Sequence, residues 1–99
     1  MNTGTYTPRQ RIVICGGHAT FVNGLKKKLK KVKYINAGVK LDPNTIKNSD
    51  VAWIQNNCLS HAQYYNIIKY AKQYRKRFIH FTNAGVDRCV EQIINDDAL

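Results

Sequence analysis

The residue types best suited to chemistry in this chain are two histidines and a cysteine. Cys58 and His61 lie three positions apart, and His18 directly follows a pair of glycines. Thiolate and imidazole are preferred zinc ligands, and a cysteine beside a histidine can also act as a nucleophile. No carboxylate that could orient either histidine lies nearby in the sequence, although such support usually accompanies both arrangements. We therefore assign no metal and no catalytic residue, and Cys58 and His61 stay candidates.

The turn Gly16-Gly17-His18 is the second feature with chemical potential. It follows a short β-branched run, and backbone N–H groups at such a turn and at a following helix attract anions. The segment is neither a P-loop, which ends in Gly-Lys-Ser or Gly-Lys-Thr, nor a GxGxxG fingerprint. A tight strand-to-helix turn without a ligand explains the same residues, so both interpretations stay open.

Polar turns also follow two later apolar runs, at 51–55 and 78–81. After the first of these runs stands Ser60, a residue suited to cap a helix. If these turns converge, they form a pocket for an anion. The predicted ligand or phosphate site consists of Gly16, Gly17, His18, Asn56, Asn57, Ser60, His61, Thr82 and Asn83.

The elements that would position these turns are short strands alternating with helices. We predict strands at 11–15, 33–37, 51–55 and 78–81. We predict helices at 20–31 and 61–74, a short helical turn beginning at Asp42-Pro43-Asn44, and a last helix that buries Val86, Cys89, Val90 and Ile93.

This alternation predicts an α/β fold, a parallel sheet with right-handed crossovers. The expected strand order is second, first, third, fourth, as in the core of a Rossmann-like or flavodoxin-like sheet. In such sheets the ligand binds at the carboxyl ends of the strands, at the point where the strand order reverses. That point would lie between the first and third strands, where the glycine turn would face Asn56, Asn57, Cys58 and His61.

Length and composition indicate one domain. The 99 residues suffice for a single modest core, with 1–10 predicted as a flexible leader and 11–99 as the domain. No run approaches the roughly 18 apolar residues of a membrane span, and the first residues lack the apolar centre of a signal peptide. Three cysteines without CxxC spacing argue against a disulfide scaffold or a zinc ribbon. We therefore expect a cytoplasmic protein with reduced thiols and no membrane association.

The charge is strongly unbalanced. Sixteen Lys and Arg stand against six Asp and Glu, a formal net charge of +10, and no acidic residue precedes Asp42. An AT-rich coding sequence would also enrich lysine, but it would not deplete carboxylates so strongly. A polyanion is the expected partner.

Nucleic acid fits this charge because tyrosines interleave with lysines late in the chain, and a single strand needs both a basic track and aromatic faces. No helix-turn-helix, RNP or zinc-finger pattern is present, which favours single-strand or backbone binding. The alternative is that Tyr64 and Tyr74 belong to the core and the lysines are merely solvated. The residues predicted to contact nucleic acid are Lys26, Lys27, Lys30, Lys31, Tyr65, Lys69, Lys72 and Lys76.

Three segments resemble a known family. They read Ile-Val-Ile-Cys-Gly-Gly-His, then Ser-Asp-Val-Ala-Trp-Ile-Gln-Asn-Asn-Cys-Leu-Ser-His-Ala, and finally Phe-Ile-His-Phe-Thr-Asn. Together they resemble the domain of unknown function family numbered twenty-three twenty-five, over about 11–94. The resemblance implies a small Rossmann-like domain of bacteria and their mobile elements. It matches the family motif at Gly16, Gly17, Ser60 and His61, and also at Cys58.

Three functional hypotheses follow from these patterns. The first is a small basic nucleic-acid-binding accessory protein from a phage or mobile element, holding phosphate at the crevice. The second is a Rossmann-like sensor or enzyme for a small nucleotide or phosphorylated ligand. The third is an interaction protein that targets an acidic protein. No cofactor is predicted, and the sequence neither requires nor forbids a homodimer.

Overall fold

The centre of the fold is a sheet of four parallel strands in the order β2-β1-β3-β4, as the alternation of patterns predicted. The computed structural model describes residues 5–36, 38–55 and 59–98. The strands are β1 Ile12–Cys15, β2 Lys33–Ile35, β3 Val51–Ile54 and β4 Arg77–His80. The helices are α1 Ala19–Lys28, α2 Pro43–Lys47, α3 His61–Gln73 and α4 Val86–Asp97.

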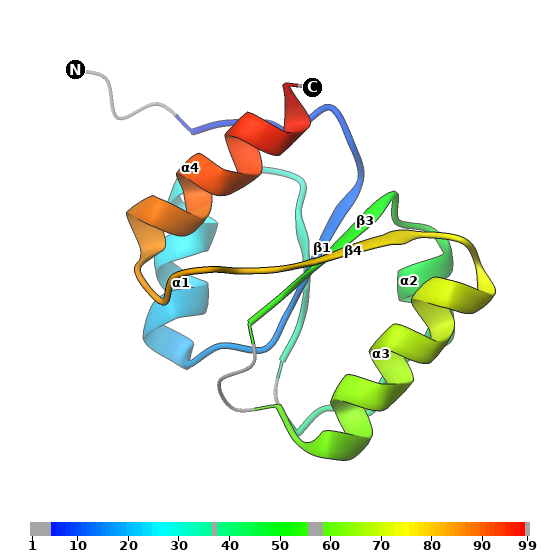
Figure 1. Ribbon diagram of the computed structural model, residues 1–99. Helices are drawn as coiled ribbons and strands as arrows, with labels where there is room; N and C mark the ends of the chain where they lie inside the picture. The colour runs from blue at the N-terminus through cyan, green and yellow to red at the C-terminus, as the bar shows by residue number, and fades with distance from the viewer. Residues whose placement is uncertain (1–4, 37, 56–58, 99) are drawn as a thin grey trace.

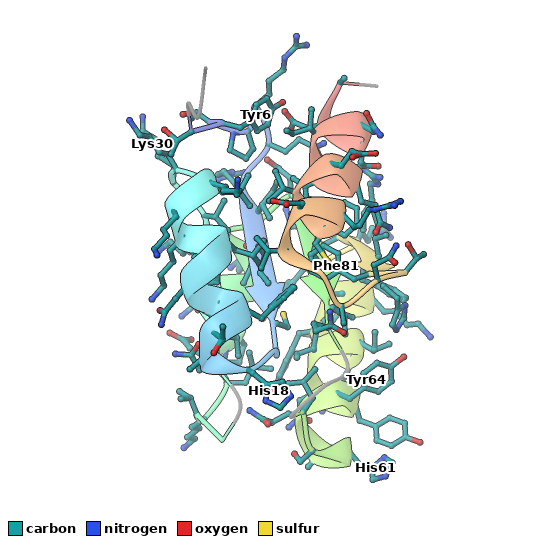
Figure 2. The ribbon with its side chains drawn as sticks, turned by 90° about the vertical axis from the view of Figure 1, so that its left-hand side faces the viewer. Tyr6, His18, Lys30, His61, Tyr64 and Phe81 are labelled. Carbon is teal, nitrogen blue, oxygen red and sulfur yellow. The ribbon has the colours of Figure 1, made fainter. Side chains whose placement is uncertain are left out.

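The two central strands are buried at every position because helices cover both faces of the sheet. Alternate side chains of β1 point to opposite faces, so Ile12 and Ile14 join one core cluster and Val13 and Cys15 the other. α1 and α4 cover the first face, and α2 and α3 cover the second. Figure 1 shows this layering, and Figure 2 looks onto the side of α1 and α4.

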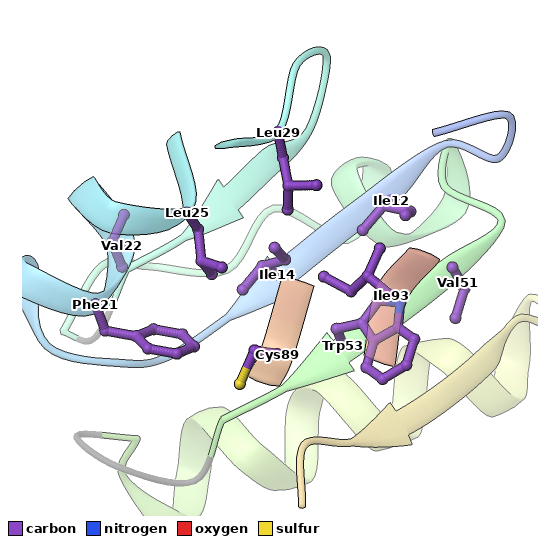
Figure 3. Packing of buried hydrophobic residues seen from close by; sticks show 10 residues of the cluster. All are labelled: Ile12, Ile14, Phe21, Val22, Leu25, Leu29, Val51, Trp53, Cys89 and Ile93. Carbon is purple, nitrogen blue, oxygen red and sulfur yellow. The ribbon is translucent and has the colours of Figure 1, made fainter. Parts of the chain in front are cut away.

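The first cluster is the larger one and contains the only tryptophan. Trp53 is 1% exposed, its neighbour across the sheet is Ile14, and Leu25 reaches the same face from α1. Cys89 and Ile93 of α4 complete this cluster (Figure 3). Of the residues that the predicted last helix was expected to bury, Cys89 and Ile93 are buried, and Val86 and Val90 are partly buried against the same cluster.

The basic helix near the start is shorter than predicted. We expected it to run over 20–31, but α1 ends at Lys28 because Leu29 takes an extended conformation and pairs with Tyr6. The backbone N–H of Lys30 donates to the carbonyl oxygen of Tyr6 at 2.9 Å, and Lys31 has a φ of 58°. Lys30 and Lys31 therefore follow the helix instead of extending its basic face.

The predicted leader is bound to the domain in its second half. The buried carboxylate of Asp97, 3% exposed, accepts hydrogen bonds from the Tyr6 hydroxyl and from the backbone N–H groups of Arg9 and Gln10. Burial alone would raise the pKa of Asp97, but these hydrogen bonds outweigh it and hold that pKa below its usual range. The end of α4 thus fastens the first described residues.

We predict that Asp97→Asn lowers the free energy of unfolding by about 2 kcal/mol at neutral pH, because the amide cannot accept all of these hydrogen bonds. The native pKa of Asp97 is depressed, so its contribution is complete at neutral pH. It is lost as the pH falls from about 4, the pKa of an unfolded Asp, through the lower native value. Urea unfolding at pH 7 and at pH 3 measures both effects.

Glu91→Gln is the matched control, because Glu91 is an exposed carboxylate on the same helix. It should leave the unfolding midpoint unchanged at both pH values. A difference between Asp97→Asn and the wild type that stayed constant down to pH 2 would contradict the linkage.

Candidate functional site

The double glycine makes a turn that no larger residue fits. Gly16 and Gly17 have φ values of +88° and +95°, a region that favours glycine. A Cβ on Gly16 would lie 2.2 Å from the carbonyl oxygen of Gln55, and one on Gly17 would lie 2.5 Å from the ring of Phe21. Close packing therefore explains both glycines without a ligand: Gly16 lies against the end of β3, and Gly17 lies against Phe21 of α1.

His18 begins α1 without capping it through its side chain. Together with Gly17, Asn23, Lys26 and Asn36 it borders a depression of about 370 Å³. This depression lies between α1 and the end of β2, whereas the predicted site lay between β1 and β3. Asn56, Asn57 and Cys58, which were to form the opposite wall, lie outside the described residues.

Ser60 caps α3, as predicted, and its partner is Gln63. The Ser60 hydroxyl accepts from the backbone N–H of Gln63 at 3.1 Å, and the Gln63 side-chain oxygen accepts from the backbone N–H of Ser60 at 3.4 Å. The Ser-x-x-Gln spacing of this capping box was readable in the sequence, but our prediction included only Ser60.

His61 is exposed in the first turn of α3, and His18 is exposed at the start of α1. Figure 2 shows the two histidines at the beginnings of different helices. Among the described residues, no three His, Cys, Asp or Glu side chains come together as a metal site. The candidate role of Cys58 falls outside those residues.

Several polar groups of the turn after β4 form hydrogen bonds to α4 and to the end of β3. The side-chain oxygen of Gln92 accepts from both the backbone N–H and the hydroxyl of Thr82, each at 3.3 Å. The carbonyl oxygen of Asn83 accepts from the Gln55 amide at 3.1 Å and from the Cys89 thiol at 3.2 Å. Thr82 and Asn83 therefore connect elements of the domain instead of presenting these groups to a ligand.

Two cysteine thiols are described, and both are buried. Burial raises the pKa of Cys15 to about 12 and that of Cys89 to about 11. Both therefore stay protonated at neutral pH, and neither is suited to act as a nucleophile.

A hydrogen-bonded pair that the sequence did not reveal joins α3 to the edge of the sheet. The Tyr64 hydroxyl lies 2.8 Å from the Nε2 atom of His80 in β4. The two residues are sixteen positions apart, so only the packing of α3 against β4 brings them together. This pair fixes the Tyr64 side chain against the sheet, whereas its neighbour Tyr65 is 68% exposed.

The predicted nucleic-acid residues divide between the two faces of the sheet. Lys26 and Lys27 lie on α1, whereas Lys69 and Lys72 lie on α3, on the opposite face (Figure 1). The basic end of α1 also borders α4, where Lys28 forms an ion pair with Asp87 at 3.4 Å. The predicted lysines therefore do not form one continuous basic surface.

α3 exposes the side chains of Tyr65, Lys69 and Lys72, which form what we call the α3 surface, and α2 adjoins this helix on the side of Tyr70 and Tyr74. The Lys69 ammonium lies 5.5 Å from the ring centre of Tyr70, and that ring stacks on Tyr74 with centroids 6.3 Å apart. Lys47 of α2 places its ammonium 5.8 Å from the ring centre of Tyr74. α3 contains no carboxylate, so nothing on this helix opposes its positive charge.

No family model, curated protein or solved structure matches this chain. The family resemblance therefore stays a prediction that rests on the quoted segments alone. Within the described residues, no helix is long and apolar enough to cross a membrane.

We predict that Gly16→Ala lowers the free energy of unfolding by more than about 3 kcal/mol, because it adds a clash with the Gln55 carbonyl to the cost of a positive φ. Gly38→Ala is the matched control: it has a φ of +81° but nothing within 4 Å of an added Cβ. It should cost about 1 kcal/mol. Equal costs in chemical denaturation would contradict the close approach of β1 to β3.

Proposed function

We propose that this chain binds single-stranded nucleic acid along the α3 surface. The observation that carries this proposal is the combination, on one carboxylate-free helix, of an exposed Tyr65 with Lys69 and Lys72. Tyr65, Lys69 and Lys72 lie four and three positions apart, which places them on one side of the helix. A single strand needs such a combination of cations for its phosphates and aromatic faces for its bases.

The aromatic side chains favour a single strand over a duplex. Bases in a duplex are stacked on each other and present only their edges, whereas an unpaired base can stack on Tyr65. Such stacking tolerates any base, so we expect binding with little sequence preference from Tyr65 itself. The lysines supply the part of the affinity that depends on salt.

The proposal leaves out two groups of predicted residues. Lys26, Lys27, Lys30 and Lys31 belong to α1 and its end, on the other face of the sheet from α3. In the predicted phosphate site, Thr82 uses its backbone N–H and its hydroxyl inside the domain, and Asn83 uses its backbone carbonyl there. The bound strand therefore runs along α3 and does not depend on a phosphate held between β1 and β3.

We predict that the double variant Lys69→Gln, Lys72→Gln binds a labelled single-stranded oligonucleotide about tenfold more weakly at 50 mM salt. The slope of log affinity against log salt should fall by about 1.4, because two phosphate contacts are lost. Fluorescence polarisation over a salt series measures both quantities.

The matched control is Lys27→Gln, Lys30→Gln, which removes the same charge outside the α3 surface. It should change the affinity much less. Equal losses in the two double variants would show attraction by net charge alone and would contradict a defined surface on α3.

Tyr65→Ala should lose the stacking contribution of about 1–3 kcal/mol, whereas Tyr65→Phe, which keeps the ring, should retain it. The same polarisation assay measures both variants at one salt concentration. An alanine variant that bound as well as the phenylalanine variant would remove Tyr65 from the interface.

A second candidate function is the binding of a small phosphorylated ligand in the depression beside α1. It is favoured by the presence of His18 and Lys26 at one hollow with the side chains of Asn23 and Asn36. Thermal-shift measurements with nucleoside monophosphates should then raise the melting temperature of the wild type and of Lys27→Gln but not of Lys26→Gln. A shift that survived in Lys26→Gln would contradict this site.

A further inference from the structure

A groove lies between residues 38–41 and the first half of α3, and it has a volume of about 480 Å³. Its walls are largely apolar, with Val39, Leu41 and Ala62 among the lining residues. Val39 is 52% exposed. In the described part of the chain, Val39 and Tyr65 are the only large hydrophobic residues that are exposed. A mostly apolar hollow of this volume falls within the range of ligand-binding pockets.

The groove is preformed, because Gln63 ties its two walls together. The Gln63 side-chain nitrogen donates to the carbonyl oxygens of Asn36 and Val39, at 3.3 and 3.1 Å. Its side-chain oxygen accepts from the backbone N–H groups of Gly38 and Ser60, at 3.1 and 3.4 Å. Both polar atoms of this amide are used inside the domain, so Gln63 shapes the groove without serving a ligand.

Lys40 and Asn66 provide the groups that can recognise a ligand in this groove. Both residues are exposed, and none of the described residues that line the groove is a carboxylate. The side-chain amide of Asn66 offers one acceptor oxygen and a donor NH₂ group, and Lys40 offers a positive charge. A matching ligand has a flat apolar body, an edge with a donor beside an acceptor, and an attached anion.

The position of the groove connects it with the α3 surface. Asn66 and Lys69 are three residues apart on α3, so they are neighbours on the surface of the helix. The Lys69 ammonium in turn lies over the ring of Tyr70. A nucleic-acid strand that follows the lysines of α3 therefore passes the opening of the groove.

We propose that the groove takes up one adenine of the bound strand. The base lies between the apolar walls, its amino group and N7 pair with the Asn66 amide, and Lys40 faces the adjoining phosphate. Asparagine matches this edge of adenine with two hydrogen bonds. Among the bases of DNA and RNA only adenine carries no carbonyl oxygen, so it places no unpaired acceptor against the apolar walls. This inference rests on the proposed function, because it assigns a base preference to the same strand.

The test compares an oligothymidylate with the same strand carrying one central adenine, as DNA and as RNA, by fluorescence polarisation. The wild type should bind the adenine-containing strand about tenfold more tightly. Asn66→Ala should bind both strands equally. Lys69→Gln, Lys72→Gln should weaken both strands alike and keep the preference, and the sugar that binds more tightly identifies the natural strand.

Asn95→Ala is the matched control, because Asn95 is an exposed asparagine on α4, across the sheet from α3. It should retain the full preference, and thermal unfolding of both asparagine variants checks that they are folded. Equal binding of the two strands by the wild type, or a preference that survives in Asn66→Ala, overturns the inference and leaves the proposed function standing. Absence of binding to either strand at low salt overturns both.

Discussion

The parallel pairing of β1 with β3 is the interaction on which the rest of the structure depends. Both strands are buried on both faces, so each must be followed by a helix that returns along the sheet. The pairing continues past the strands, where the backbone N–H of Gln55 donates to the carbonyl oxygen of Cys15 at 2.8 Å. At that point Gly16 lies so close to Gln55 that a side chain would not fit. The same contact that closes the core therefore determines the shape of the first turn.

The strand order also separates the two basic helices. β2 lies on one side of β1, and β4 lies on the other side of β3, so the two connections run in opposite directions across the sheet. Because both crossovers are right-handed, helices that run in opposite directions cover opposite faces. α1 and α3 consequently occupy different layers. The division of the lysines between two surfaces thus follows from the strand order and the handedness of the crossovers.

Much of the fold could be predicted from the sequence, because the apolar runs of β1 and β3 and the cap at Ser60 are local signals. The errors arose from distant partners. α1 ends early because Leu29 pairs with Tyr6. The fourth strand, predicted to begin at residue 78, begins at Arg77, whose guanidinium forms an ion pair with Asp96. The prediction of the ligand site failed to account for distant partners in the same way. Its residue types were suggestive, but the hydrogen bonds that Thr82 makes with Gln92 become visible only once α4 has packed.

The positions of the few carboxylates determine where the positive charge of this protein is least opposed. Five of the six carboxylates make contacts within the domain. Asp42 caps α2, and Asp97 binds the first described residues. The other three, Asp50, Asp87 and Asp96, form ion pairs. Asp87, Asp96 and Asp97, with Glu91, belong to α4, so negative charge is gathered on the layer that α4 shares with α1. On α3 no carboxylate weakens the field of Lys69 and Lys72. This distribution of charge supports the proposal that a polyanion binds at the layer of α2 and α3, where Tyr65 is exposed and the groove begins.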